Sequence, residues 1–125
     1  MINGRLLPRD KYDTDAATKL VALEWEMIEP VMPQILEWCQ DRNWPVAVVF
    51  QPFLANVGVR LLPFVRTVFA TDDDIWKYNI LVDIVGQSTA LATALRADLE
   101  RMANHPSSGE RLEGVAEEAQ AILAS

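Results

Sequence analysis

One pattern occurs twice in this 125-residue chain and restricts what it can fold into. Each copy begins with an apolar residue and proline, continues as an amphipathic run, and ends in a polar turn that is followed by tryptophan. The first copy spans residues 32–44 and the second spans residues 62–76. A pattern repeated at about the length of a helical hairpin is typical of stacked helix pairs. The repeat therefore predicts an architecture, and it specifies no chemical reaction.

Apolar residues recur at helical spacing in seven segments, each bounded by capping residues, proline or glycine. The fifth segment is apolar on nearly every side apart from Lys77, Asn79 and Asp83, so it is predicted to be the most buried helix. An alternative for residues 46–50 is a strand, because this stretch is rich in β-branched and aromatic side chains. The predicted helices are Thr14–Trp25, Met32–Asn43, Val46–Val57, Leu61–Phe69, Ile75–Val85, Ser88–Met102 and Glu110–Leu123.

Several capping patterns support these boundaries. Asp13 begins the first helix, and Ser88 or Thr89 begins the sixth. Thr71 and Asp74 have the spacing of a capping box, as do Ser107 and Glu110. In the last helix the predicted buried stripe begins at Leu112, whereas Glu110 is placed on the opposite, polar face. The residues of that stripe are Leu112, Val115, Ala116, Ala119, Ile122 and Leu123.

Seven short helices joined by short turns predict an all-α fold of stacked antiparallel pairs, as in compact HEAT or armadillo solenoids. A globular helical bundle is the structural alternative. The length of the chain is typical of one domain, which is predicted to cover residues 1–125. The sequence favours no particular oligomeric state.

The charge balance restricts the classes of partner. Eighteen acidic and eleven basic residues give a net charge of −7, which opposes binding to nucleic acid or to an anionic membrane surface. An acidic surface suits a basic protein partner, although many proteins are acidic only because charge keeps them soluble.

Cysteine usage and hydropathy indicate a compartment. Cys39 is the only cysteine, so it cannot form an intramolecular disulfide, and its place on an apolar helix face predicts a buried thiol. The first ten residues lack a signal-peptide core, and charges or prolines interrupt the apolar runs before they reach membrane-spanning length. We therefore expect a cytoplasmic protein.

Residues that could support catalysis are few. His105 is the only histidine and has no recognisable nucleophile beside it, so we expect no enzyme activity, metal or cofactor. Asp72, Asp73 and Asp74 form the one dense carboxylate cluster, which could cap a helix, hold magnesium or face a partner. Asp73 also precedes Lys77 by four residues, the spacing of a helix ion pair.

Two tryptophans complete the set of candidate partner-binding residues. Trp44 and Trp76 each follow a polar turn, where an indole can fold back over the hairpin. An exposed tryptophan in such a place would instead anchor a partner, because tryptophan is enriched among residues that dominate interface energy. The predicted partner-binding residues are Asp72, Asp73, Asp74, Trp76 and Trp44.

Three segments carry a resemblance to a known family. They are residues 7–13 (LPRDKYD), residues 43–47 (NWPVA) and residues 72–78 (DDDIWKY). Together with the turn at residues 104–106 and the acidic final helix, they make the chain similar to an uncharacterised bacterial family of small, all-helical, HEAT-like proteins. The resemblance implies the fold over nearly the whole chain, and it carries over no catalytic residue.

The first functional hypothesis is a protein-binding module, most concretely a cytoplasmic immunity or antitoxin-like inhibitor of a basic bacterial toxin. Small size, acidity and a rigid helical scaffold are compatible with it. The second hypothesis is a scaffold or adaptor that binds a peptide or a partner helix. A remote third is a magnesium-dependent enzyme that uses Asp72, Asp73 and Asp74.

Overall fold

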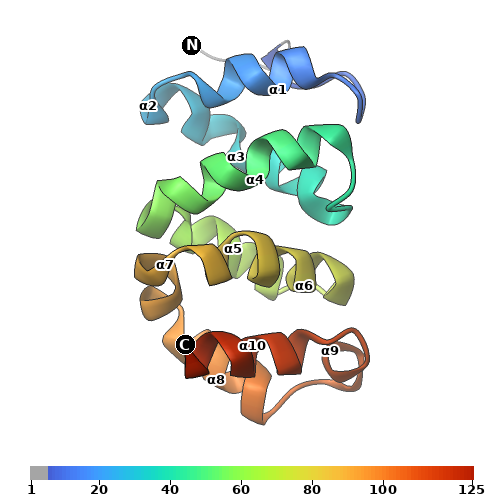
Figure 1. Ribbon diagram of the computed structural model, residues 1–125, viewed down its shortest axis with the longest axis vertical. Helices are drawn as coiled ribbons and strands as arrows, with labels where there is room; N and C mark the ends of the chain where they lie inside the picture. Colours follow the sequence, from blue (N-terminus) through green and yellow to red (C-terminus); the bar gives the residue numbers. More distant parts are fainter. Residues whose placement is uncertain (1–5) are drawn as a thin grey trace. The chain divides into compact units, whose positions relative to one another are not determined.

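The structure, a computed structural model, describes residues 6–125, and helix is the only regular secondary structure within that range (Figure 1). The predicted all-α class is confirmed. By its contacts the chain divides into two compact units, Met1–Phe53 and Leu54–Ser125. The HEAT-like stacking and the single domain over residues 1–125 stay predictions.

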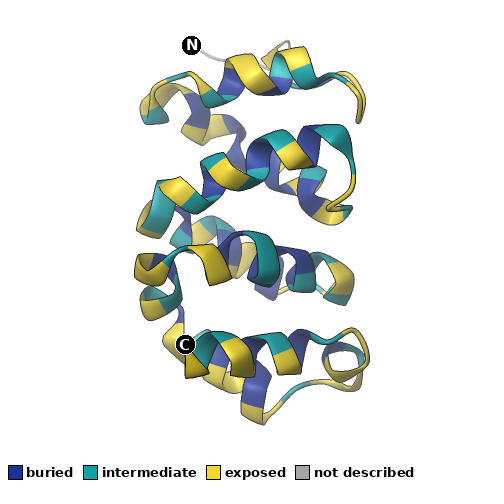
Figure 2. Cartoon of the chain, viewed as in Figure 1, coloured by how far each residue is buried: buried dark blue, intermediate teal, exposed yellow. Residues whose placement is uncertain are grey.

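The first unit consists of short helical segments. Its core is made by the apolar faces of these segments, and Figure 2 shows buried and exposed positions alternating along them. Cys39 lies within this core and is 3% exposed, as predicted. The segments are α1 (Thr14–Val21), α2 (Trp25–Ile28), the 3₁₀ helix η2 (Glu29–Val31), α3 (Met32–Glu37), the 3₁₀ helix η3 (Trp38–Gln40) and α4 (Pro45–Val57), whose last residues belong to the second unit.

The second unit contains the remaining helices. Within it α10 packs against α8 and α6, which places the C-terminal helix beside two segments distant in sequence (Figure 1). Side chains such as Ile80, Leu99 and Val115 are completely or almost completely buried there. The segments are the 3₁₀ helix η4 (Gly58–Leu61), α5 (Leu62–Phe69), α6 (Asp74–Asp83), the 3₁₀ helix η5 (Val85–Gln87), α7 (Thr89–Ala94), α8 (Arg96–Asn104), α9 (Ser108–Leu112) and α10 (Val115–Ala124).

Proline marks helix starts, as the repeated pattern predicts. Pro33 and Pro63 occupy the first turn of α3 and α5, where a missing amide proton costs no intrahelical hydrogen bond. Pro52 lies inside α4, and residues 46–50 form part of the same helix. The strand considered for residues 46–50 is therefore wrong.

Four predicted helices are divided. The segment from Thr14 ends at Val21 and restarts as α2, since Glu24 is extended, with φ −63° and ψ 150°. The segment from Met32 ends at Glu37 and continues as 3₁₀ helix to Gln40. The sixth is split at Leu95 and the seventh at Gly114. Periodicity did not reveal these breaks, because the apolar spacing continues across each of them.

The break at Gly114 corrects the predicted stripe of the last helix. Gly114 has φ +82°, a left-handed conformation that ends α9 and starts α10. Val115 and Ala119 are buried as predicted, whereas Leu112, on the other side of the break, is 81% exposed. An uninterrupted helix would have placed Leu112 on the buried face with them, since residues three and seven positions apart share a face.

The capping predictions are largely confirmed. Asp13 accepts a hydrogen bond from the amide of Ala16, and Ser88 accepts one from the amide of Leu91. The capping box of Ser107 and Glu110 is present in full. The box predicted for Thr71 and Asp74 is wrong, because Asp73 is the residue that caps α6.

Within the described part of the chain, one segment, Pro45–Phe69, is long and apolar enough by length and composition to cross a membrane. A single such segment is weak evidence, since core helices of water-soluble proteins pass the same test. It is also not one α-helix: α4 has 13 residues, α5 has 8, and between them Gly58 adopts φ +74°. A helix that crosses a bilayer needs about 20 residues.

Gly58 and Gly114, the two glycines with positive φ among the described residues, allow a matched test of the helix break at Gly114. Gly58→Ala should destabilise the protein by roughly 1 to 2 kcal/mol, because a side chain at positive φ crowds the following carbonyl. A Cβ atom at Gly58 would have open space, whereas one at Gly114 would lie 3.4 Å from the ring of Tyr78. Gly114→Ala should therefore cost at least as much as Gly58→Ala in urea denaturation. A smaller loss at Gly114 would contradict the described break.

Candidate functional site

The three carboxylates of the acidic turn, defined as Asp72–Asp74, differ in their contacts. Asp73 Oδ1 accepts a hydrogen bond of 3.0 Å from the amide of Trp76 at the start of α6. Asp74 Oδ1 lies 3.0 Å from Lys77 Nζ. Asp72 is exposed. The ion pair predicted between Asp73 and Lys77 is thus wrong, and the acidic partner from this turn is Asp74.

Lys77 is buried in the second unit, although it is one of the three polar residues that interrupt the apolar surface predicted for its helix. Its side chain is 6% exposed, and Nζ lies 3.0 Å from Asp74 Oδ1 and 3.2 Å from Glu110 Oε2. A buried ammonium group is stable only when it is paired and hydrogen-bonded. The two carboxylates satisfy that requirement and link α6 to α9.

Glu110 is the most heavily engaged charged residue of this cluster. Its side chain is 1% exposed, and Arg101 donates to it from both terminal nitrogens, with Nη2 2.8 Å from Oε2. The amide of Ser107 donates to Oε1 over 2.8 Å, and the Ser107 hydroxyl accepts from the amide of Glu110. The predicted capping box is therefore also the centre of an ion cluster, and the predicted exposed position of Glu110 is wrong.

This environment changes the acidity of Glu110. The pKa of Glu110 is lowered from 4.5 to about 2. The hydrogen bonds from Arg101 are the largest cause, the Ser107 amide and Lys77 act in the same direction, and burial acts in the opposite direction. Glu110 is consequently a carboxylate at every pH near neutrality, and it is a poor proton donor for general acid catalysis.

The cluster of Asp74, Lys77, Arg101 and Glu110 contains two positive and two negative side chains. Each charged side chain forms an ion pair with an opposite charge, and these ion pairs link α6, α8 and α9. The cluster therefore contains no unpaired acid or base that could take part in proton transfer. Within residues 6–125 every buried side-chain nitrogen or oxygen has a hydrogen-bond partner. Two signals in the sequence pointed to such a cluster: a lysine in a largely apolar helix and the capping-box spacing of Ser107 and Glu110.

The two candidate tryptophans lie in different units. Trp44 packs edge to face on Trp38, with ring centroids 5.6 Å apart and an interplanar angle of 72°. Both Trp44 and Trp76 are half-buried. Trp44 thus covers its own hairpin, the structural alternative considered for it, and the partner-binding role of both residues stays a prediction.

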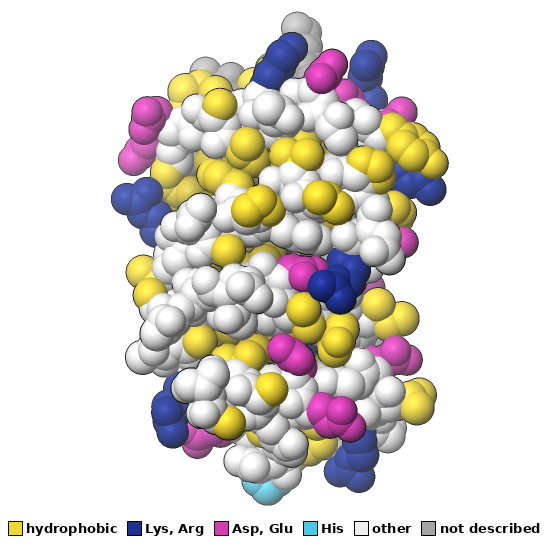
Figure 3. Space-filling model, in the orientation of Figure 1, with side chains coloured by type: hydrophobic (Ala, Val, Ile, Leu, Met, Phe, Trp, Pro, Cys, Tyr) yellow, Lys and Arg dark blue, Asp and Glu magenta, His cyan; other side chains and the backbone are white. Residues whose placement is uncertain are grey.

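A shallow groove of about 540 Å³ lies where α9 meets α10, beside α6. The ring of Tyr78 and the exposed side chain of Leu112 provide its apolar surface, and Glu113 and Glu117 are exposed at its edge. Figure 3 shows acidic and hydrophobic side chains side by side over α9 and α10. We call this hollow the α9–α10 groove. Its lining residues are Tyr78, Arg111, Leu112, Glu113, Gly114, Glu117, Glu118 and Ala121.

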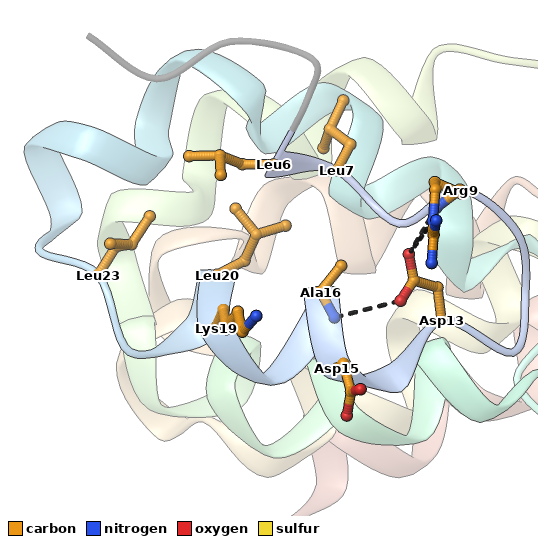
Figure 4. Close-up of a pocket in the computed structure, with 9 residues that line it drawn as sticks. All are labelled: Leu6, Leu7, Arg9, Asp13, Asp15, Ala16, Lys19, Leu20 and Leu23. Carbon is orange, nitrogen blue, oxygen red and sulfur yellow. Dashed lines mark hydrogen bonds and ion pairs between the residues drawn. The ribbon is translucent and has the colours of Figure 1, made fainter.

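A second hollow, of about 410 Å³, lies in the first unit along α1 (Figure 4). Leucines form its apolar part, and Arg9 and Asp13 make an ion pair of 3.3 Å at its edge. The Arg9 amide, 3.0 Å from the carboxylate, is the main cause that lowers the pKa of Asp13. Two acidic and two basic residues line this hollow, so it favours neither a positive nor a negative ligand. Its lining residues are Leu6, Leu7, Arg9, Asp13, Asp15, Ala16, Lys19, Leu20 and Leu23.

Among residues 6–125 no group of three histidine, cysteine or acidic side chains lies in a position to hold a metal ion. The carboxylates of Asp73 and Asp74 are already bonded to the Trp76 amide and to Lys77. His105 is exposed at the end of α8. The acidic turn is therefore a capping and ion-pairing element first.

These features define an all-helical protein with a charge-neutral ion cluster around the buried Glu110 and an acidic surface groove. Residues 6–123 match the family described as "Domain of unknown function (DUF5071)", and the chain belongs to that family. No curated protein matches the sequence. The match covers both units and confirms the resemblance to a family without an assigned function.

The acidic turn can be tested with two neighbouring variants. Asp73→Ala should cost about 1 kcal/mol of stability, because the Trp76 amide loses its capping oxygen. Asp72→Ala is the control, and it should change stability by less than about 0.5 kcal/mol since Asp72 is exposed. Equal losses in thermal or urea unfolding would contradict Asp73 as the cap.

Glu110→Gln should destabilise the protein by roughly 3 to 5 kcal/mol at pH 7, because Lys77 and Arg101 lose a buried counter-ion. The pKa of Glu110 is about 2 in the folded protein against an ordinary 4.5, so its contribution is complete above pH 4.5 and is lost as the pH falls toward 2. Urea denaturation should show the stability gap between parent and variant narrowing by roughly 3 kcal/mol over that window.

Glu113→Gln is the matched control for this titration. Glu113 is exposed, and its replacement should change stability by less than about 0.5 kcal/mol at any pH between 7 and 3. If the difference in free energy of unfolding between the parent and Glu110→Gln stays constant as the pH falls from 4.5 toward 2, the ion cluster does not govern the acid sensitivity of the protein.

Proposed function

We propose that the protein is a protein-binding module that binds a basic protein partner through the acidic surface of its second unit. The observation that carries the proposal is the state of Glu113, Glu117 and Glu118. Among the described residues these carboxylates form no salt bridge, and all three line the α9–α10 groove. Exposed acids of the first unit such as Glu24 form none either, so the grouping of three along one groove is what distinguishes this surface.

Unpaired acids on neighbouring turns repel one another. Glu113 and Glu117 lie on either side of the break at Gly114 and line the same groove, so their like charges are near one another. A basic partner would remove that repulsion and would be attracted over distance, which raises the rate of encounter. The net charge of −7 acts in the same direction.

The most concrete form of this function is a cytoplasmic inhibitor of the immunity or antitoxin type, which occludes a basic toxin. An inhibitor needs a rigid surface and opposite charge, and it needs no catalytic group of its own. The ion cluster around Glu110 supports rigidity, because it fixes α6, α8 and α9 relative to one another within the second unit. A magnesium-dependent enzyme gains no support from the acidic turn, whose Asp73 and Asp74 are already bonded.

The test uses the partner captured from the native cell by the tagged chain and then purified. Replacing Glu113, Glu117 and Glu118 by Gln should slow association with that partner roughly tenfold at low salt. The control replaces Glu24, Glu26 and Glu37, three exposed acids of the first unit, by Gln. Both triple variants change the net charge by the same amount, so only the position of the charge differs.

Stopped-flow or biosensor kinetics at two salt concentrations distinguish the outcomes. Added salt should bring the second-unit variant close to the parent, since screening shortens the reach of exposed charges from about 8 Å at 0.15 M to about 3 Å at 1 M. Equal effects of both triple variants, or a captured partner that is itself acidic, would refute binding through the second unit.

A further inference from the structure

Leu112 is the most exposed of the large hydrophobic side chains that the structure describes, at 81%. Its exposure has a definite cause. The left-handed turn at Gly114 separates α9 from α10, so Leu112 leaves the buried face that Val115 and Ala119 occupy. The ion cluster around Glu110 holds α9 in this orientation, because Glu110 lies in α9 itself.

Tyr78 completes an apolar surface next to Leu112. The ring lies so close to Gly114 that a Cβ atom there would be 3.4 Å from Tyr78 Cε1. Both the ring and Leu112 line the α9–α10 groove. The glycine therefore has two effects: it turns Leu112 outward and leaves room for the tyrosine ring beside the backbone.

The groove also has direction and length. Gly114, Glu117, Glu118 and Ala121 line it at intervals of three and four residues, so they form one face of α10 over about two turns, or roughly 10 Å. A single ion or a small metabolite would occupy only part of such a face. A segment of polypeptide with a repeating side-chain pattern matches it along its length.

The charge of the groove determines which charge the bound segment must carry. Its lining contains three glutamates and one arginine, and the described residues supply no salt bridge to Glu113, Glu117 or Glu118. These carboxylates line the same groove as Leu112 and Tyr78, so the surface combines acidic and apolar side chains. The complementary surface is a helix with one apolar stripe flanked by lysine or arginine.

We propose that the α9–α10 groove binds a basic amphipathic helix of another protein. Apolar side chains of that helix pack on Leu112 and Tyr78, and its lysines or arginines pair with Glu113, Glu117 and Glu118. This inference rests on the proposed function and makes it specific, since it names the groove and the secondary structure of the bound segment.

The probe is a synthetic helical peptide of about 14 residues, made of lysine and leucine with every leucine on one face. A second peptide has the same composition in scrambled order, so that it has equal charge and no apolar face. Each is titrated into the isotope-labelled full chain and followed by NMR. The amphipathic peptide should shift the amide signals of Leu112, Glu113 and Gly114 and bind at least tenfold more tightly than the scrambled one.

Leu112→Gln tests the apolar contact with little effect on folding, because Leu112 is exposed and glutamine is a good helix former. It should weaken binding of the amphipathic peptide at least tenfold at an unchanged melting temperature. Val48→Gln, at a position in α4 that is 55% exposed, is the matched control and should leave the affinity unchanged.

Two results would overturn the inference. One is equal affinity of the parent and Leu112→Gln for the amphipathic peptide; the other is a set of shifted signals that lies outside α9, α10 and Tyr78. Either result leaves the proposed function to be judged by the captured partner, because that protein could still bind elsewhere on the acidic surface. Capture of an acidic partner, with the peptide still bound in the groove, would instead refute the proposed function alone.

Discussion

Glu110 is the residue on which the arrangement of the second unit depends. One carboxylate receives hydrogen bonds from Arg101 of α8, Lys77 of α6 and the amide of Ser107 at the start of α9. Removing a carboxylate from water is costly, and the cost is offset only because all of its acceptor capacity is used. The same contacts that satisfy the charge also decide where α9 begins and against which helices it lies.

That constraint extends to the molecular surface. Since α9 is fixed at its N-terminal end by the cluster and at its C-terminal end by Gly114, its five residues have little freedom to turn Leu112 inward. The exposed leucine is thus a consequence of where the buried charges lie. A surface held in this way loses little conformational entropy when a partner covers it, which favours affinity without a large interface.

The sequence predicted the helical class and most of the residues that cap the helices. Side chains that cap helices, such as Asp13 and Ser107, and prolines in first turns, such as Pro33, act on neighbouring backbone atoms, so their effect can be inferred from spacing alone. The all-α class follows from these signals together with the apolar periodicity.

The candidate site was predicted less well, for a physical reason. The ion pairs of Glu110 join residues nine and thirty-three positions apart, and no local spacing reveals which distant cation a carboxylate will meet. Leu112 was misplaced because one left-handed glycine interrupts an apolar pattern that otherwise continues. The sequence identified Asp72 and Asp73 as part of an acidic turn. Which of the two caps α6 and which is exposed depends on the backbone geometry of the turn, and that geometry cannot be inferred from the sequence alone.

The burial of Lys77 has a practical consequence for chemical modification. The chain contains three lysines, and Lys11 and Lys19 are exposed in the first unit while Lys77 is enclosed by two carboxylates. Reagents directed at lysine side chains will react with Lys11 and Lys19 and will spare the second unit. Immobilisation through these lysines therefore leaves the side chains that line the α9–α10 groove chemically unmodified.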